Sequence, residues 1–383
     1  MDILFLSTVL PHGRAAGGEV ASHAVIDALD AAGHAVTVVG YRRTGDDRPA
    51  PRGWVEAGRR PIETDQAGRL TVGAWVAGAL ARRLPYSAAK YRSRAYLETV
   101  RSLTRSGGFD LAVVDHAQLG WLQPELERTG LPFILVAHNV EAQMYAEQAA
   151  RARGPRRLVL RREARLIRRL ERRLAGRARG VWALSEADAA YFRRFGEAWP
   201  IPIHSSFTAP PPLEKSCDVA LMGTWSWSAT RAALQWFLDR VHPRLPDGLT
   251  VEVAGRGGDW IDGAYPGVRY RGFVPDALSF LAATRAVAVP AVGGTGVQLK
   301  TLDAIASGAR VVASPAAVRG LGDLPGSVDV AGTPKEFASA LGRLATAPES
   351  TEPSREGIEW SRERRERFRT AVAAAAHAAV SAP

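Results

Sequence analysis

The residues best suited to chemistry lie between Gly293 and Asp303, where the sequence reads GGTGVQLKTLD. An apolar run at 286–291 precedes this loop and a helical pattern at 297–307 continues from it, so the loop is expected to open a helix. Glycines free the backbone there, and the unpaired N–H groups of a helix N-terminus attract a diphosphate. Lys300 adds a mobile positive charge, and Asp303 could accept hydrogen bonds from ribose hydroxyls. The competing interpretation is an ordinary glycine-rich turn.

Two further strand endings carry glycines. Gly13, Gly17 and Gly18 follow the first apolar run and open a helical pattern, so backbone N–H groups there could approach a phosphate or sugar closely. Their spacing is not that of the dinucleotide fingerprint, and a tight turn between strand and helix explains them equally well. Arg256 stands among glycines in the run VAGRGG and could hold a phosphate through two N–H groups. The alternative is a surface arginine in a turn.

Polar residues also follow two strands of the first half. His116 comes after the run that ends in Asp115, and His138, Asn139 and Glu141 come after the run 132–137. The carboxyl ends of parallel strands meet at one edge of a sheet, which is where such sheets bind ligands. Two endings of this kind favour a functional site, although a histidine at a strand end often only packs.

Several reaction classes lack their motifs in this sequence. It contains no Asp-x-Asp, so a metal–diphosphate site of that type is not indicated, and no metal is expected. It also lacks Gly-x-Ser-x-Gly and the P-loop pattern. Cys217 is the single cysteine, which excludes an internal disulfide and a cysteine-rich metal site and fits a reducing compartment.

The charge of the chain is uneven. The net charge is +11, and residues 151–180 contain thirteen arginines against two acids, Glu163 and Glu171. A solvated helix face is the favoured interpretation of the arginine-rich helix within 151–179, and docking to an anionic membrane surface is the alternative. No nucleic-acid partner is expected, since no aromatic residues alternate with the arginines. No apolar stretch is long enough to span a membrane, and the N-terminal run fits a buried strand better than a signal peptide.

Apolar runs alternate with helical patterns in both halves of the chain. The expected strands are 1–7, 34–40, 109–115, 132–138, 180–185, 217–223, 249–255, 268–273, 286–291, 309–314 and 327–332. The expected helices are 18–32, 71–106 with a break near Pro85, 155–178, 229–240, 276–284, 297–307, 334–346 and 354–380. The strand runs do not alternate with polar residues, which is typical of parallel sheets covered on both faces. Residues 41–69 are expected to form a loop or weak edge, and five prolines in 196–216 predict an irregular linker.

These motifs, in this order, resemble glycosyltransferase family 4, whose members are retaining enzymes with the GT-B fold. The resemblance spans almost the whole chain and is strongest across 293–308; it also includes Gly17-Gly18-Glu19, the run after His138, and the stretches 183–188 and 223–236. It implies an α/β GT-B protein with two Rossmann-like domains that face a central cleft. The implied domains are 1–205 on the acceptor side, 206–355 on the nucleotide-sugar side, and a C-terminal helix 356–383 that crosses back.

The resemblance also implies roles for residues. Gly17 and Gly18 would face the donor diphosphate and sugar, His116 would act beside the donor sugar with Lys300 as the second catalytic residue, and Arg256 would contact the donor. The acceptor side would include His138, Asn139 and Glu141. The nucleotide-sugar would be held by Gly294, Thr295, Gly296, Val297, Gln298 and Leu299, and by Asp303, which matches the second glutamate of the family's paired motif.

The sequence departs from the family pattern at two places. Thr295 stands where relatives carry the first glutamate of the pair, so one sugar contact is lost or replaced. The arginine and lysine that many relatives carry after the first strand of the second domain are also missing, and Arg231 or Lys300 could supply the charge instead.

The sequence therefore predicts a cytoplasmic, metal-independent retaining glycosyltransferase, with the inner membrane face as an alternative location. It would use no cofactor and would take a UDP-, GDP- or dTDP-sugar as substrate. The acceptor would be a hydroxyl of a natural product or of a cell-surface glycan or glycolipid precursor. The alternatives are an inactive nucleotide-sugar-binding protein and a GT-B epimerase.

Overall fold

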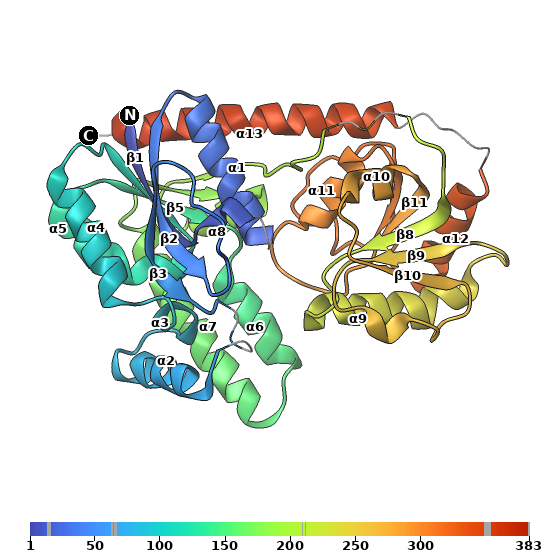
Figure 1. Ribbon diagram of the computed structural model, residues 1–383, viewed down its shortest axis with the longest axis horizontal. Helices are drawn as coiled ribbons and strands as arrows, with labels where there is room; N and C mark the ends of the chain where they lie inside the picture. Colours follow the sequence, from blue (N-terminus) through green and yellow to red (C-terminus); the bar gives the residue numbers. More distant parts are fainter. Residues whose placement is uncertain are drawn as a thin grey trace. The chain divides into compact units, whose positions relative to one another are not determined.

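The computed structural model describes residues 1–13, 17–62, 64, 67–208, 210, 212–347 and 354–381, and it divides into two compact units (Figure 1). Unit 1 comprises Met1–Ile203 and Arg367–Pro383, and unit 2 comprises His204–Glu366. Residues 14–16 of the predicted first glycine loop lie outside the described residues.

Unit 1 is built on a parallel sheet. Its strands are β1 (Asp2–Val9), β2 (Ala35–Arg43), β3 (Trp54–Arg60), β4 (Leu111–Asp115), β5 (Phe133–Ala137), β6 (Gly180–Ala183) and β7 (Ala198–Pro200). These described strands run in the order β3-β2-β1-β4-β5-β6-β7, and each neighbouring pair is parallel. The central strands β4 and β5 are buried at every position, as expected for strands with helices on both faces.

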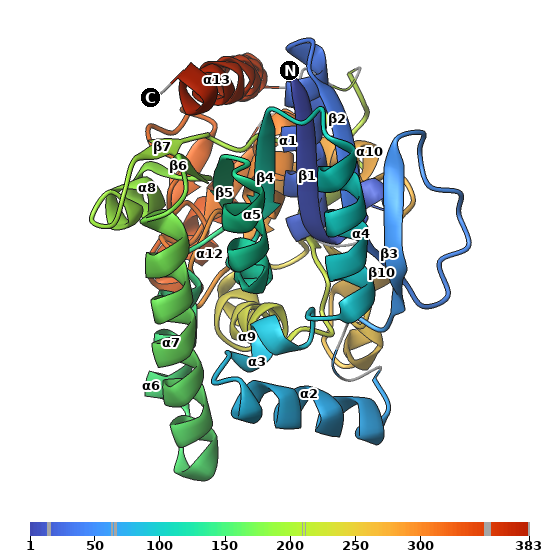
Figure 2. The same cartoon turned by 90° about the vertical axis from the view of Figure 1, so that its left-hand side faces the viewer.

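The helices of unit 1 lie between and around these strands. They are α1 (Gly17–Ala31), α2 (Arg69–Ala81), α3 (Tyr86–Ala89), α4 (Arg94–Ser106), α5 (Gln123–Thr129), α6 (Glu141–Arg151), α7 (Gly154–Ala175) and α8 (Glu186–Phe192), with 3-10 turns η1 (Pro11–Gly13) and η2 (Ala117–Leu122). Helices α4 and α5 lie over one face of the sheet and α1 over the other (Figures 1 and 2). The sequence did not predict α5, α6 or α8.

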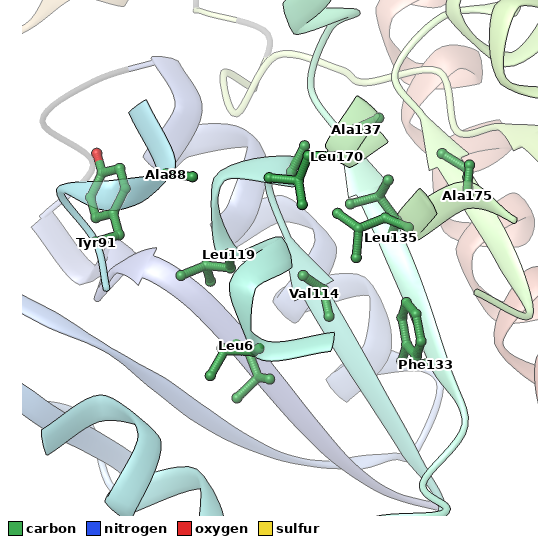
Figure 3. Packing of buried hydrophobic residues seen from close by; sticks show 14 of the residues in the cluster. Leu6, Ala88, Tyr91, Val114, Leu119, Phe133, Leu135, Ala137, Leu170 and Ala175 are labelled. Carbon is green, nitrogen blue, oxygen red and sulfur yellow. The ribbon is translucent and has the colours of Figure 1, made fainter. Parts of the chain in front are cut away.

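The core of unit 1 joins the sheet to η2 and α7. Figure 3 shows Leu6, Val114 and Leu135 of the strands clustered with Leu119 of η2 and Leu170 of α7. A Cβ on Gly120 would come within 2.6 Å of Leu174 Cδ1, so the glycine allows η2 to pack closely on α7. The buried residues of α7 recur every three or four positions, which confirms the predicted amphipathic helix.

Residues 41–69, expected to form a loop or a weak edge, contain the edge strand β3, which confirms the second alternative. The side chains of β3 are mostly half-buried, so its sequence shows no continuous apolar run. The expectation that 196–216 is irregular is wrong at its start, because this proline-rich segment contains β7, which pairs with β6 at the other edge of the sheet. Pro200 is the last residue of β7 and is tolerated because an edge strand has an unpaired side.

Unit 2 repeats the same design. Its strands are β8 (Cys217–Met222), β9 (Val251–Ala254), β10 (Val268–Gly272), β11 (Thr284–Val289), β12 (Arg310–Ala313) and β13 (Val328–Val330). The described strands form a parallel sheet in the order β10-β9-β8-β11-β12-β13. Its longer helices are α9 (Ser228–Trp236), α10 (Ala277–Ala282), α11 (Leu299–Ala306) and α12 (Pro334–Ala345). A separate core forms around Trp225, Phe237 and Phe337.

The C-terminal helix α13 (Arg355–Ser381) contributes residues to both units, with its first residues in unit 2 and Arg367 onward in unit 1. Within the described part of the chain, no helix has both the length and the hydropathy that crossing a bilayer requires. Both sheets are parallel and their strands alternate with helices, which confirms the predicted α/β class.

Candidate functional site

In unit 1, a buried carboxylate meets side chains from β1, from α1 and from the segment after β5. Asp115, the last residue of β4, has no exposed surface. Its Oδ2 accepts hydrogen bonds from Ser7 of β1 at 2.8 Å and from Ser22 of α1 at 2.6 Å. Its Oδ1 lies 2.7 Å from Nε2 of His138, which follows β5. The strand order β1-β4-β5 places these residues together, because the strands are parallel and their carboxyl ends share one edge.

His116 lies on this cluster in a strained backbone conformation. Its φ is 76°, in the left-handed region that side chains other than glycine rarely adopt. Its ring stacks on that of His138, with centroids 3.7 Å apart and an interplanar angle of 24°. A Cβ on Gly18 would lie 3.6 Å from Cε1 and Nε2 of His116, so the start of α1 contacts the imidazole. The structure thus brings Gly18, His116 and His138 together, as the sequence predicts.

Electrostatics fix the charge of this cluster. Burial raises the pKa of Asp115, but the neighbouring His116 and His138 and the hydrogen bonds from His138 and Ser22 outweigh it and lower the pKa to about 2. Burial, and then the charge of His138, lower the pKa of His116 to about 4, against the opposing effect of Asp115. At neutral pH the cluster therefore has an ionised Asp115 and a neutral His116 that can donate one hydrogen bond and accept another.

The same three residues have the chemistry of a metal site. One ligand atom from each of Asp115, His116 and His138 lies within 4.8 Å of the others. Both oxygens of Asp115 already accept hydrogen bonds, and Nε2 of His138 is already engaged. A cation would have to break that network, so these residues fit a hydrogen-bonded cluster better than a metal centre.

The predicted acceptor-side residues Asn139 and Glu141 lie next to this cluster. Glu141 is the first residue of α6 and is 8% exposed. Burial raises the pKa of its carboxyl, while a hydrogen bond from Gln118, the charge of His138 and a hydrogen bond from Asn139 lower it. Among the described residues, Oδ1 of Asn139 is buried without a hydrogen-bond partner.

In unit 2, the glycine loop leads from β11 into α11. Gly293, Gly294 and Gly296 have φ values of 157°, 121° and 80°, so the loop follows a path that requires glycine. The helix begins at Leu299, directly after Gln298, which has an extended backbone and gives no side-chain cap. Among the described residues, the N-cap side chain therefore accepts no hydrogen bond from the first N–H groups of α11. The carbonyl of Gly294 accepts a hydrogen bond from Arg319.

Two polar side chains of this loop and helix are buried: the hydroxyl of Thr295 and the ammonium group of Lys300. The hydroxyl oxygen of Thr295 is buried and makes no hydrogen bond to any described residue. Such a group calls for an explanation, and a bound ligand is one. Nζ of Lys300 lies 3.1 Å from the carbonyl oxygen of Pro290, and burial lowers its pKa to about 8.

Asp303 lies one turn after Lys300 and is held by a residue far away in sequence. Its Oδ1 accepts a hydrogen bond of 2.6 Å from Ser205, whose carbonyl accepts one from Arg365 of α13. Burial raises the pKa of Asp303 to about 6, against the lowering effect of the Ser205 hydroxyl. The sequence predicted Asp303 but missed Ser205, which belongs to the proline-rich segment and carries no local signal.

Arg256 lies on a different loop, after β9. Its guanidinium carbon is 4.6 Å from the ring centroid of Phe273, and the side chain is exposed. Its carbonyl accepts a hydrogen bond of 2.7 Å from the backbone N–H of Trp225. The sequence missed Phe273 and Trp227, which follow β10 and β8 and are 61% and 54% exposed. The available signal was a large aromatic residue shortly after a strand that ends in glycine, since Phe273 follows Gly272 and Trp227 lies four positions after Gly223.

Two family models match the chain. A glycosyl transferase 4-like domain matches residues 16–204, and a domain of the glycosyl transferases group 1 matches residues 217–347. No curated protein sequence matches the chain significantly.

Solved structures share the fold over nearly the whole chain. Sucrose-phosphate synthase from Thermosynechococcus elongatus is 18% identical with a TM-score of 0.64, covering 98% of this chain and 97% of its own. HepE of Anabaena, in complex with UDP and glucose, is 15% identical with a TM-score of 0.65, covering 98% and 99%. WaaG, a glycosyltransferase involved in lipopolysaccharide biosynthesis, is 14% identical with a TM-score of 0.62, covering all of both chains.

At these identities the structural likeness shows the fold alone, which is GT-B. The two family models match consecutive parts of the sequence, one in each unit, and together they include most of its residues. The chain therefore belongs to the family 4-like glycosyltransferases with the GT-B fold.

Proposed function

We propose that this glycosyltransferase moves a sugar from a UDP-, GDP- or dTDP-sugar to an acceptor hydroxyl with retention of the anomeric configuration. The bond between the anomeric carbon and the diphosphate oxygen breaks. The acceptor oxygen bonds to that carbon from the same face, and its proton passes to the departing diphosphate. HepE was solved with UDP and with UDP-glucose, which supports a nucleotide-sugar as the donor.

The observation that carries this proposal is the loop before α11. Its three glycines at positive φ bring backbone N–H groups to the start of a helix, where the helix dipole favours an anion. The unpaired hydroxyl of Thr295 would donate to the same ligand, and Lys300 would supply a positive charge. In the proposal, residues 294–299 hold the diphosphate, and Lys300 stabilises the charge that develops on it as the sugar leaves.

Asp303 would bind the ribose of the nucleotide. Its carboxylate accepts one hydrogen bond from Ser205, and its remaining lone pairs can accept hydroxyl protons from a ligand. Arg256, with its exposed guanidinium on Phe273, would contribute a further positive charge to the nucleotide. We assign these roles to unit 2 because each of these residues belongs to it.

His116 of unit 1 would contact the transferred sugar. It is neutral at neutral pH, so it would act through hydrogen bonds rather than through charge. Gly17 and Gly18 at the start of α1 would let a sugar approach the backbone next to its ring. His138, Asn139 and Glu141 would serve the acceptor side. The hydrogen bonds on both oxygens of Asp115 disfavour a metal ion at this cluster, and the proposed reaction needs none.

We place the reaction in the cytoplasm on the basis of Cys217. The only cysteine of the chain is buried, and burial raises the pKa of its thiol to about 11. A chain with one buried thiol has no disulfide to form and fits a reducing compartment.

Thermal denaturation with UDP, GDP, dTDP, ADP and CDP, without added metal, tests the donor assignment. A nucleotide at ~100 times its dissociation constant adds ~2.7 kcal/mol of stability, which corresponds to several degrees in Tm. Asp303→Ala should weaken the binding of the nucleotide that gives the shift, and Asp262→Ala, an exposed acid of the same unit, should not. If calorimetry gives the same affinity for Asp303→Ala as for the unchanged protein, the ribose assignment is wrong.

A second candidate is a nucleotide-sugar-binding protein without turnover. Thr295 in place of the family's glutamate favours it, since the lost carboxylate removes one contact to the sugar. Incubation of the protein with a donor that raises its Tm and with hydroxyl acceptors distinguishes the two functions, because any glycosylated product rules out the second.

A further inference from the structure

The outward face of α2 is apolar. Its inward residues Trp75 and Ala79 are buried, but Leu70, Val76 and Leu80 are 92%, 43% and 59% exposed. A surface helix of a water-soluble protein normally carries charged or polar residues on that face. From Arg69 to Ala81 the sequence has a single ionisable residue, Arg69. The water-facing side of α2 therefore lacks the groups that would keep it hydrated.

A second exposed apolar pair lies at the beginning of α7. Leu158 and Val159 are 66% and 65% exposed. Arg162 of α7 donates a hydrogen bond of 3.2 Å to the carbonyl oxygen of Ala79, which joins the two helices. Both views show α2 and the beginning of α7 at the same end of unit 1 (Figures 1 and 2). We call Leu70, Val76, Leu80, Leu158 and Val159 the apolar patch.

The segments that carry the apolar patch are rich in basic residues. The sequence from Arg69 to Arg92 has five basic residues and no acid, and 151–162 has six arginines and no acid. Two acids of α6 and α7 lie near these arginines in sequence. Glu147 pairs with Arg151 at 3.9 Å, and Glu163 is buried and so adds no negative charge to the surface. Two acids that precede α2 in sequence, at positions 63 and 65, lie outside the described residues.

This combination selects one kind of partner. Nucleic acid would match the arginines but would leave the leucines and valines in water. A second copy of this chain in a symmetric pair would bring two groups of arginines together, and like charges at an interface oppose association. An anionic bilayer matches both features, since its headgroups attract arginine and its acyl boundary takes up apolar side chains.

We propose that unit 1 docks on an anionic lipid bilayer through the apolar patch. Leu70, Val76 and Leu80 of α2 enter the headgroup region together with Leu158 and Val159. The arginines next to them, including Arg156 and Arg157, contact the lipid phosphates. This proposal does not depend on the reaction that the protein catalyses.

The single buried cysteine allows a direct test. In Leu70→Cys, a thiol-reactive fluorophore that is sensitive to polarity would label the new cysteine, because Cys217 is buried. Vesicles of phosphatidylcholine with phosphatidylglycerol should shift the emission of the fluorophore to the blue and make it stronger, because the fluorophore enters the apolar part of the bilayer. High salt should reverse the change. Vesicles of phosphatidylcholine alone should have little effect. The matched control is Val330→Cys, a 48% exposed position in unit 2, which should not respond.

Sedimentation of the full chain with the same vesicles separates the contribution of the apolar side chains from that of the arginines. Leu70→Glu with Leu80→Glu should reduce the bound fraction at least tenfold, and Arg156→Glu with Arg157→Glu should do so at low salt. Arg269→Glu with Arg310→Glu makes the same charge change at exposed positions of unit 2 and should bind like the unchanged protein. Circular dichroism and Tm would verify that each variant folds.

Three results would overturn the proposal. The first is equal binding to neutral and anionic vesicles, or no binding to either. The second is unchanged binding by both pairs of unit 1 variants. The third is a concentration-dependent dimer that Leu70→Glu with Leu80→Glu abolishes without any effect of lipid, because it would assign the apolar patch to a second copy of the chain.

Discussion

Lys300 and Asp303 lie one turn apart on α11, and burial moves their pKa values towards each other. The pKa of Lys300 falls to about 8, and that of Asp303 rises to about 6. Burial disfavours the charged form of both groups, so an ammonium loses its proton more easily and a carboxyl holds its proton more firmly. Near neutral pH both groups are charged, which is the state that the proposed diphosphate and ribose contacts require.

Nucleotide affinity should therefore have a maximum between about pH 6 and pH 8. Above pH 8 Lys300 loses the charge that attracts the diphosphate, and below pH 6 Asp303 becomes protonated and loses acceptor capacity. Calorimetric titration of the bound nucleotide from pH 5 to pH 9.5 measures this. In Lys300→Arg the loss above pH 8 should disappear, because arginine stays charged. An alkaline limb that is unchanged in Lys300→Arg would exclude Lys300 as its origin.

Asp115 gives a second prediction at this scale. Asp115→Asn removes the charge and leaves one oxygen to serve Ser7, Ser22 and His138, so we expect a loss of about 1–3 kcal/mol in the free energy of unfolding. Ser22→Ala removes a single donor and should cost less, about 1 kcal/mol. Urea denaturation of the three proteins checks the order. A variant Asp115→Asn as stable as the unchanged protein would show that the network contributes nothing to folding.

At the scale of elements, α7 positions other helices through its two acids. Glu163 accepts hydrogen bonds from the backbone N–H groups of Tyr86 and Ser87 at the start of α3, both at 2.8 Å. Glu171 accepts from the backbone N–H groups of Glu141 and Ala142 at the start of α6, at 2.7 and 3.3 Å. Each side chain thus accepts hydrogen bonds at the N-terminus of a helix that begins in a different part of the sequence.

The cap at Glu171 should make stability depend on pH. Burial and the neighbouring Glu141 raise the pKa of Glu171 to about 8, from 4.5, against the lowering effect of its backbone hydrogen bonds. The folded state then binds the proton more tightly than the unfolded state, so the free energy of unfolding should fall as the pH rises from about 4.5 to about 8. Denaturation at pH 5.5 and 8 should show this fall, and Glu171→Gln should make it smaller.

Glu98→Gln is the control for this experiment. Glu98 is an exposed acid of α4 that pairs with Arg94, and its replacement should leave the pH dependence as it is in the unchanged protein. If the free energy of unfolding falls by the same amount between pH 5.5 and 8 in Glu171→Gln and Glu98→Gln, a group other than Glu171 takes up the proton.

At the scale of the whole molecule, each unit has a hydrophobic core of its own. One cluster of buried residues in unit 1 includes Phe192 and one in unit 2 includes Phe337, and both side chains are fully buried. Two-state unfolding is an approximation that chains with several cores often violate. Scanning calorimetry is therefore expected to show two transitions.

Variants assign the two transitions. Phe192→Ala should lower the transition of unit 1 and Phe337→Ala that of unit 2, each by about 3–5 kcal/mol of stability. A nucleoside diphosphate should raise only the transition that Phe337→Ala lowers, since the glycine loop and α11 belong to unit 2. A nucleotide that raises the other transition would contradict the assignment of the diphosphate to this loop.

The sequence by itself determined the inner strands of the two sheets and the edge strands β10 and β13, the helices α1 and α11 that follow two of the glycine loops, and the position of the loop 293–298 between β11 and α11. These features depend on local physics: continuous apolar runs become buried strands, and glycines before a helical pattern open a helix. The strand β7 escaped prediction and β3 was expected only as a weak edge, because one side of each is unpaired and the sequence of neither has a continuous apolar run.

Only the tertiary structure decided which side chains meet. Asp115 gathers Ser7, Ser22 and His138, and Asp303 is held by Ser205, which is 98 positions away. It also decided that the apolar face of α2 is exposed and does not pack into the core of unit 1. Such contacts follow from strand order and from the packing of helices on sheets, and neither is encoded in the spacing of residues along the chain.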